Sequence, residues 1–553
     1  MVGMQALLEV LAAAGVRHIF GNPGSTELSL NAALATDSRF TYILGLQEVP
    51  VAAMADGYAM ASGGLGVACV HTCCGLGNAM GMLYNAYCEG SSLLVLAGQQ
   101  DRRLRFEEPV LAGDMVSVAR PWTKWATEIE RVEDLPSAVR RAVQTALTPP
   151  TGPVFLSIPV DVQLTGVEGL DLTPPHVPDR RVRPPQDALN RAATLLAEAC
   201  HPVILAGSRV VEAGAVAELV TLAELLGALV LADPPTSHGR LPMPADDPLY
   251  GGTVPQDANS LARRLADKDV VLAVGISLLR RFQYQDAEQP FRAGVHLIQM
   301  DSDSWELGKN YPVEIALVGD PQAGLAELVD MVALSYGSEQ REAAARRRIE
   351  LAARRADNRA RLLLEMEKQR GRRPMSPVVM MEALARALPP DAAVVLEASA
   401  HTHLNVLERL GVLRDPTGHF GHRGWALGWG LGCAIGVKLA WPDRPAVALL
   451  GDGAALYTIQ GLWSAAHHRV PVVFVIANNA QYNVLKHTAD GLWVPPEKLV
   501  GLDLTEPEVD FVALSHGFGV EAFRVTEPDD LAQRVAAGVE GAEPLLLDVT
   551  IER

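Results

Sequence analysis

Short runs of aliphatic residues alternate along the chain with longer stretches rich in Ala and Leu. The runs are continuously apolar, which is typical of strands that are buried on both faces of a parallel sheet. The longer stretches have the length and composition of helices. The pattern predicts an α/β protein of doubly wound parallel sheets. Expected strands are Val67–Val70, Leu93–Ala97, Val154–Ile158, Val203–Ala206, Val270–Val274, Leu297–Met300, Ala393–Leu396, Ala446–Leu450, Val472–Ile476 and Leu545–Val549.

Two polar segments divide this pattern into thirds. The first, Gly166–Gln186, contains TPPHVPDRRVRPPQ, and Pro-Pro steps cannot lie inside helices or central strands. The second, Tyr336–Pro377, contains a charged Arg/Glu/Ala stretch from Glu342 to Arg370. That stretch predicts a solvent-exposed linking helix, with an anion-binding patch as the alternative. The predicted domains are residues 1–165, 186–335 and 377–553.

The first and last thirds show a weak internal similarity. SSLLVLAGQQ resembles VPVVFVIANNA, and GPVFLSIPVDV resembles EPLLLDVTIER near the chain end. Two copies of one α/β domain around a different middle domain would explain both pairs.

Composition and charge exclude several classes of protein. The chain is 49% hydrophobic and carries 65 acidic against 47 basic residues, for a formal net charge of −18. Nucleic acids and anionic membranes both need a basic footprint, so neither is an expected partner. The six cysteines include no CxxC pair, and no apolar run reaches the ~20 residues of a membrane span. We expect a cytoplasmic protein with reduced thiols.

The first candidate for chemistry is Gly451-Asp452-Gly453. It directly follows the strand Ala446–Leu450 and precedes a helical stretch, Tyr457–His468. Glycines at a strand-to-helix turn let the backbone approach an anion, and the helix N-terminus favours phosphate. Alone, the motif also fits an ordinary turn.

A second motif changes this interpretation. Twenty-four residues separate Gly453 from Asn478-Asn479, enough for one helix and the strand Val472–Ile476. Both motifs then lie at the carboxyl edge of one sheet, where ligands bind in open α/β sheets. The Asp452 carboxylate, the Asn479 amide oxygen and the Gln481 carbonyl, with phosphate oxygens and water, would give Mg²⁺ its octahedral oxygen set.

GDG followed by NN at this spacing resembles the signature of the thiamine-diphosphate enzyme family, and the chain resembles the benzoylformate decarboxylase branch of that family. Leu46-Gln47-Glu48 matches its catalytic glutamate, GNPGSTEL (Gly21–Leu28) its substrate loop, and HTCCGLGNAMGML from His71 its catalytic histidine segment. The resemblance is strongest at residues 18–100 and 425–485 and weakest in the middle third.

The resemblance implies a pyrimidine-binding first domain and a diphosphate-binding last domain, with thiamine diphosphate and Mg²⁺ as cofactors. Glu48 would share a proton with the aminopyrimidine in a dry site. His71 would act as acid and base, and Ser25 would bind the substrate carboxylate. The alternatives are an exposed helix start for Glu48, a structural histidine, and a helix N-cap serine.

The resemblance also implies further cofactor contacts. Leu427, within WALGWGLG, matches the bulky residue that holds the cofactor in a bent form, with a core leucine as the alternative. Diphosphate-side positions match His401, Gly451, Asp452, Gly453, Ala454, Asn479 and Tyr482.

The chain departs from the branch around the substrate. Phe282 stands where the branch has a second histidine, and Phe cannot transfer a proton. Candidates to replace that histidine are His403, His422 and His487. Aromatic residues that flank an aryl ring in the branch are matched by Gly421 or His422 and by Thr488, and Val484 replaces a small residue. A reshaped pocket follows.

We therefore expect a decarboxylase of a 2-oxo acid that releases CO₂ and an aldehyde. The alternatives are an acetolactate-synthase-type carboligase and a non-catalytic cofactor-binding homologue. A flavin-bound synthase is a further variant, although the sequence contains no FAD-specific motif. The resemblance implies a homodimer or homotetramer with sites between subunits.

Overall fold

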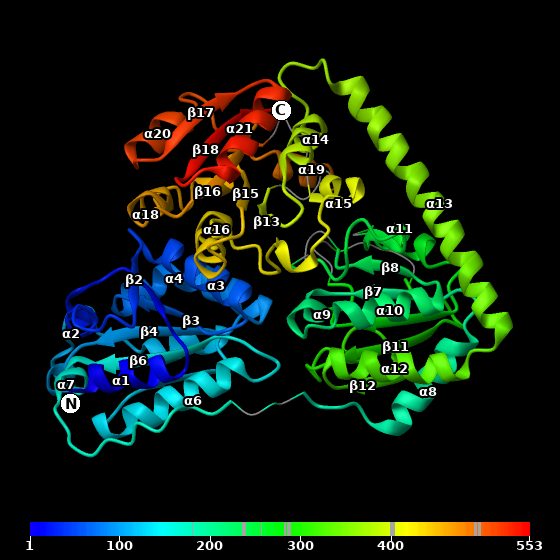
Figure 1. Cartoon of the computed structure of the whole chain (residues 1–553). Coiled ribbons are helices and arrows are strands. Elements are labelled where there is room, and N and C mark those ends of the chain that lie inside the picture. Colours follow the sequence, from blue (N-terminus) through cyan, green and yellow to red (C-terminus); the bar gives the residue numbers. More distant parts are fainter. Residues whose placement is uncertain are drawn as a thin grey trace.

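The computed structural model describes residues 1–177, 179, 181–234, 239–255, 257–280, 284, 289–398, 404–491, 495 and 499–553. They form three sheets of six strands each, with helices covering both faces (Figure 1). Every strand pair within these sheets is parallel. The predicted fold class is confirmed.

The first sheet has the order β2-β1-β3-β4-β6-β5. Its strands are β1 (His18–Gly21), β2 (Thr41–Leu44), β3 (Gly66–Val70), β4 (Leu93–Gln99), β5 (Trp125–Glu128) and β6 (Val154–Pro159). Its helices are α1 (Gly3–Ala13), α2 (Leu28–Leu34), α3 (Glu48–Ser62), α4 (Thr72–Glu89), α5 (Met115–Ala119), α6 (Leu135–Leu147) and α7 (Val160–Leu164).

The middle sheet has a different order, β12-β11-β10-β7-β8-β9. Its strands are β7 (Val203–Ala206), β8 (Leu229–Ala232), β9 (Tyr250–Thr253), β10 (Val270–Val274), β11 (His296–Asp301) and β12 (Ile315–Val318). Its helices are α8 (Gln186–Glu198), α9 (Ser208–Glu212), α10 (Val216–Leu226), α11 (Ala258–Arg264) and α12 (Pro321–Ser335).

The third sheet has the order β14-β13-β15-β16-β18-β17. Its strands are β13 (Ala393–Glu397), β14 (His419–Phe420), β15 (Ala446–Gly451), β16 (Val472–Asn478), β17 (Glu521–Val525) and β18 (Leu545–Thr550). Its helices are α14 (Pro377–Ala387), α15 (Leu404–Leu410), α16 (Trp429–Ala440), α17 (Asp452–Ala455), α18 (Gly461–His467), α19 (Asn483–Gly491), α20 (Phe511–Gly517) and α21 (Pro528–Glu540).

The first and third sheets have the same topology. Counted along the chain, both follow the order second, first, third, fourth, sixth, fifth strand. The two similar sequence pairs fall on β4 with β16 and on β6 with β18, the fourth and sixth strands of each sheet. The prediction of two like domains around a different middle domain is confirmed.

The like domains pack against each other through α3 and α16. A Cβ on Gly57 would lie 2.3 Å from the Cys433 carbonyl oxygen, so the two backbones touch where side chains are absent. At the same contact, the Trp429 indole Nε1 donates a 2.7 Å hydrogen bond to the buried carboxylate of Asp56. Burial raises the pKa of Asp56 to about 7.

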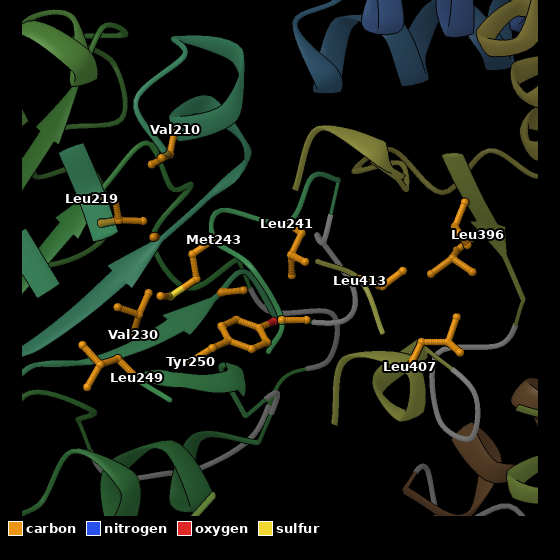
Figure 2. Packing of buried hydrophobic residues seen from close by; sticks show 14 of the residues in the cluster. Val210, Leu219, Val230, Leu241, Met243, Leu249, Tyr250, Leu396, Leu407 and Leu413 are labelled. Atoms are coloured by element: carbon orange, nitrogen blue, oxygen red, sulfur yellow. The ribbon is translucent and has the colours of Figure 1, made fainter. Parts of the chain in front are cut away.

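The middle and third domains share a continuous apolar core. Figure 2 shows it running from Val230 and Leu249 of the middle domain, through Tyr250, to Leu407 and Leu396 of the third. The long helix α13 (Ser338–Gln369) connects the same two domains along the outside of the molecule (Figure 1). It is largely exposed, burying Ala344, Leu362 and Met366, and so confirms the predicted linking helix.

One predicted helix is wrong in part. The stretch Tyr457–His468 does not form a single helix, because residues 456–460 are turns between α17 and α18. The reason is a tertiary contact. The buried Thr458 hydroxyl donates a 2.9 Å hydrogen bond to the carbonyl of Gly428 before α16, and a helix through this point would not place it there. Within the described part of the chain, no helix is long and apolar enough to cross a membrane.

Candidate active site

The site residues of the first domain gather where its strand order reverses. The segment after β1 carries Ser25 and Glu27, and His71 directly follows β3, the neighbour of β1. In open α/β sheets, ligands bind outside the carboxyl ends of the strands at this switch point.

His71 is held by a buried carboxylate. Its Nδ1 lies 2.7 Å from Glu27 Oε2, and the Glu27 side chain is only 3% exposed. Glu27 Oε1 accepts hydrogen bonds from the Gly98 backbone N–H at 2.7 Å and the Thr26 hydroxyl at 2.8 Å. A carboxylate only accepts, so His71 Nδ1 carries the proton and Nε2 is left for proton exchange.

The backbone on either side of this pair is constrained. Thr72, which begins α4, has φ +47°, a left-handed conformation that costs free energy in a non-glycine residue and often marks a functional site. A Cβ on Gly24 would lie 1.9 Å from His71 Nδ1, so the substrate-loop backbone rests against the imidazole. Ser25 follows Gly24, is exposed, and begins a 3₁₀ turn, Ser25–Glu27, without a side-chain cap bond.

Glu48 begins α3 and is 7% exposed, so the exposed helix start considered as its alternative is wrong. The Asn78 amide donates a 3.0 Å hydrogen bond to Glu48 Oε2. Both Asn78 and Gly75 belong to α4, and a Cβ on Gly75 would lie 2.6 Å from Glu48 Oε1. The helix that follows His71 therefore also forms the wall behind Glu48.

The third domain carries the GDG and NN segments at the ends of adjacent strands β15 and β16. Asp452 Oδ1 accepts from the Gly453 N–H at 2.7 Å, and Oδ2 accepts from the Asn479 N–H at 3.1 Å. Asn479 Oδ1 in turn accepts from the Gln481 N–H at 3.1 Å. The three predicted metal ligands thus belong to one hydrogen-bonded network, which joins Asp452 at the start of α17 to the turn after β16.

These residues fit a magnesium ion. Asp452 is 5% exposed, and within the described residues no Lys, Arg or His forms an ion pair with it. Burial raises the pKa of this carboxyl, while backbone N–H groups from Gly453 and the 479–481 turn oppose that rise. A divalent cation would supply the missing countercharge, and carboxylate, amide and carbonyl oxygens are the donors it prefers.

The same turn is strained and closely packed. Ala480, between Asn479 and Gln481, has φ +54°. A Cβ on Gly453 would lie 2.4 Å from Cε1 of Tyr482, so glycine makes room for that ring. A cavity of about 640 Å³ opens beside Asp452 and Asn479, with Arg524 and Arg553 also in its lining.

The remaining predicted cofactor contacts are placed as follows. Gly451 ends β15, and the buried Ala454 lies in α17. Leu427 is half-buried, unlike the fully buried core leucines, and precedes Gly428, whose φ of +94° turns the chain into α16. His401, like His403 and Phe282, lies outside the described residues.

Sequence reasoning missed a buried carboxylate at the end of β13. Glu397 accepts hydrogen bonds from the backbone N–H groups of Gly428, Trp429 and Gly430, at 2.9, 2.9 and 2.8 Å. Burial raises its pKa to about 7 despite these donors. It caps α16 and so fixes the segment that carries Leu427. Glu27 was missed as well, although it stands within the GNPGSTEL motif.

Of the histidines considered in place of the missing one, His422 does not suit the role. It is 4% exposed, its Nδ1 accepts from the Trp425 N–H at 3.0 Å, and burial lowers its pKa to about 3. His487 is exposed on α19, the helix that also carries the half-buried Val484 and Thr488.

Three family models match the chain in the order of its domains. The "Thiamine pyrophosphate enzyme, N-terminal TPP binding domain" matches residues 1–112, the "central domain" residues 189–328, and the "C-terminal TPP binding domain" residues 403–549. The chain belongs to the thiamine pyrophosphate enzyme family, whose first and last domains bind the cofactor.

Within the family, the chain resembles decarboxylases and carboligases. It is 34% identical to benzoylformate decarboxylase of Pseudomonas aeruginosa, with 98% of both chains covered. It is 29% identical to a probable acetolactate synthase large subunit of Methanocaldococcus jannaschii, covering 100% of this chain and 92% of that one. A 4-hydroxybenzoylformate decarboxylase of Rhodococcus jostii has the same fold, with a TM-score of 0.86, 30% identity and coverage of 100% and 99%.

Proposed function

We propose that this chain is a non-oxidative decarboxylase of a 2-oxo acid, releasing CO₂ and an aldehyde. The observation that carries the proposal is the His71–Glu27 pair at the switch point of the first domain. It is an oriented acid–base group with a free Nε2, beside a loop suited to binding a carboxylate. Decarboxylases among the similar proteins support this reaction class.

Bound thiamine diphosphate supplies the nucleophilic carbon and the electron sink for loss of CO₂. The protein's own groups then have separate tasks. Ser25 binds the substrate carboxylate through its hydroxyl. Glu48 is shielded from water and held by Asn78, and it shares a proton with the aminopyrimidine of the cofactor. His71 Nε2 exchanges a proton with the substrate oxygen while Glu27 holds Nδ1.

The third domain anchors the cofactor in this proposal. Asp452, Asn479 and Gln481 would hold Mg²⁺, and the Gly451–Ala454 turn with Tyr482 and His401 would surround the diphosphate. Leu427 would contact the cofactor and hold it in its bent form. We further propose that the complete site forms between two subunits, so that a dimer is the smallest active unit.

A carboligase is the second candidate, and Phe282 favours it. Without a histidine at this position, the last protonation is slower, and the decarboxylated fragment has longer to join a second carbonyl compound. A non-catalytic homologue is disfavoured, because a binding protein needs Asp452 but has no use for a buried, hydrogen-bonded Glu48.

Product analysis tests the proposal. Purified protein with thiamine diphosphate and Mg²⁺ is incubated with single 2-oxo acids, both aryl and aliphatic, with and without an added aldehyde. The proposal predicts CO₂ and a free aldehyde in equal amounts. A hydroxyketone as main product would establish the carboligase instead, and absence of CO₂ from every acid would overturn both.

A further inference from the structure

A second cavity shares no lining residue with the cavity beside Asp452 and Asn479. It has a volume of about 310 Å³ and is enclosed by β9 of the middle domain, α13 and α15. All four residues of β9, from Tyr250 to Thr253, line it, so the cavity lies along the edge strand of the middle sheet.

The lining of this cavity is strongly cationic. Five arginines from three helices contribute to it, while the described lining residues include one acid, Glu408. Burial raises the pKa of Glu408 to about 7, and its carboxylate accepts from the Tyr250 hydroxyl, so it offsets little of the charge. The arginines are Arg264, Arg354, Arg355, Arg359 and Arg409.

Four of these guanidinium groups have no anionic partner among the residues that the structure describes. Within the described residues, Arg264, Arg354, Arg359 and Arg409 form no ion pair within 4.0 Å. Three nearby carboxylates form ion pairs with other cations: Asp267 with Lys268, Asp357 with Arg361 and Asp246 with Arg414. Asp247 and Asp246 act on Arg355, the fifth arginine. In a chain of net charge −18, this local excess of positive charge stands out.

The arginines also repel one another. Burial lowers the pKa of Arg264, and the charge of Arg354 lowers it further. Burial also lowers the pKa of Arg355, where Asp247 and Asp246 oppose the shift and Arg359 adds a small lowering. Arg355 and Arg359 are four residues apart on one helix, a spacing at which like charges destabilise the helix. A bound anion would remove this cost.

The cavity is preformed and partly apolar. The Arg355 guanidinium donates to the carbonyls of Tyr250 at 2.8 Å and of Ala245, which fixes it in place. Leu229, Leu351 and Pro248 supply apolar walls. Figure 2 shows Tyr250 fixed within the core between the middle and third domains.

We propose that this cavity binds a small organic phosphate in which a di- or polyphosphate is joined to a flat apolar group. Arginine is the side chain that best matches phosphate oxygens through paired hydrogen bonds. Several guanidiniums around one space need a ligand of more than one negative charge, and the apolar side chains of Leu229, Leu351 and Pro248 suit a ring system.

The test is isothermal titration of the full chain, saturated with thiamine diphosphate and Mg²⁺ so that the diphosphate site of the third domain is filled. Probes are ADP, inorganic pyrophosphate and adenosine. We expect one ADP per chain, weaker binding of pyrophosphate, no detectable adenosine, and weaker ADP binding as salt is raised.

Variants locate the site. Arg354 and Arg359 are exposed, and their double substitution R354E/R359E should weaken ADP at least tenfold, with R354Q/R359Q as a milder version. R348E, an exposed arginine earlier on α13 and outside the cavity lining, is the matched control and should bind like the wild type. Absence of saturable ADP binding, equal binding by the double variants, or adenosine binding as well as ADP would each overturn the proposal. No turnover is needed, so the outcome is independent of the proposed decarboxylation.

Discussion

The first and third domains share one topology but carry different chemistry at the same place. At the end of the third strand, one domain has His71 and the other has Asp452. His71 is bonded to a side chain, the buried Glu27, and keeps one nitrogen free. Asp452 is bonded to backbone N–H groups, which leaves a carboxylate without a cationic partner in the described structure.

Each domain also has a buried glutamate, either at the end of its first strand or in the segment that follows, and the two glutamates have different partners. In the first domain, Glu27 turns toward the site and orients His71. In the third domain, Glu397 turns inward and caps α16. The same topology thus places different side chains at the end of the third strand, and the partners of those side chains distinguish the proton transfer that we propose for His71 from the cation binding that we propose for Asp452.

The largest effect is expected from Asp452→Ala. Loss of the carboxylate should weaken cofactor binding at least about 100-fold, because losing even an outer partner of a metal ligand typically costs 10- to 100-fold. Titration of thiamine diphosphate with and without Mg²⁺ measures this. Asp443→Ala, at an exposed position of the same domain, is the control and should bind normally. Unchanged, Mg²⁺-dependent binding by Asp452→Ala would remove Asp452 from the metal site.

The equivalent change in the first domain should affect turnover instead. His71→Ala should lower kcat about 10²- to 10⁴-fold, the usual contribution of a general acid–base group, with cofactor affinity unchanged. Glu27→Gln should lower kcat at least about tenfold, because His71 would no longer be held in the required tautomer and orientation. The double variant should be no slower than His71→Ala, because the two residues act as one unit. Additive losses would contradict the positioning role of Glu27.

Glu397→Gln should have the opposite signature to Glu27→Gln. An amide cannot accept all three N–H groups of the α16 N-terminus, and one buried unsatisfied group costs about 1–3 kcal/mol. Chemical denaturation should show this loss of stability, while kcat at saturating cofactor changes less than in Glu27→Gln. If Glu397→Gln lowered kcat without lowering stability, Glu397 would be a residue of the active site and not a structural cap of α16.

Glu397 also predicts a pH dependence. Its folded pKa of about 7 lies above the ~4.3 of an unfolded glutamate, so the folded state holds the extra proton between these values. Its contribution to stability is therefore fully present below about pH 4 and is lost as pH rises through about 7. Glu397→Gln, which has no proton to lose there, should show a flatter stability profile over this window.

The smallest effect concerns the strained turn between the proposed metal ligands Asn479 and Gln481. Ala480 has a left-handed conformation that glycine adopts without penalty, so Ala480→Gly should change stability by less than about 0.5 kcal/mol. Ala356→Gly, at an exposed position inside α13, should cost about 1 kcal/mol. Equal losses in a denaturation experiment would show that the Ala480 conformation stores no strain.

The sequence predicts the strands and both motifs well, because buried parallel strands and glycine turns are local signals. The break after α17 could not be predicted, since it depends on Thr458 reaching the carbonyl of Gly428, distant in the chain. Glu27 and Glu397 were missed for the same reason. A glutamate in a polar loop or at a strand end has no pattern of its own, and its partners come from elsewhere in the fold.

In the proposed enzyme, the first domain performs proton transfer on a cofactor that the third domain anchors. The most direct measurement is the rate of CO₂ release from 2-oxo acids at saturating thiamine diphosphate and Mg²⁺, in the wild type and in Glu48→Gln. The account predicts release by the wild type and a loss of at least about 100-fold in the variant. No release by the wild type, or an undiminished rate in Glu48→Gln, would contradict it.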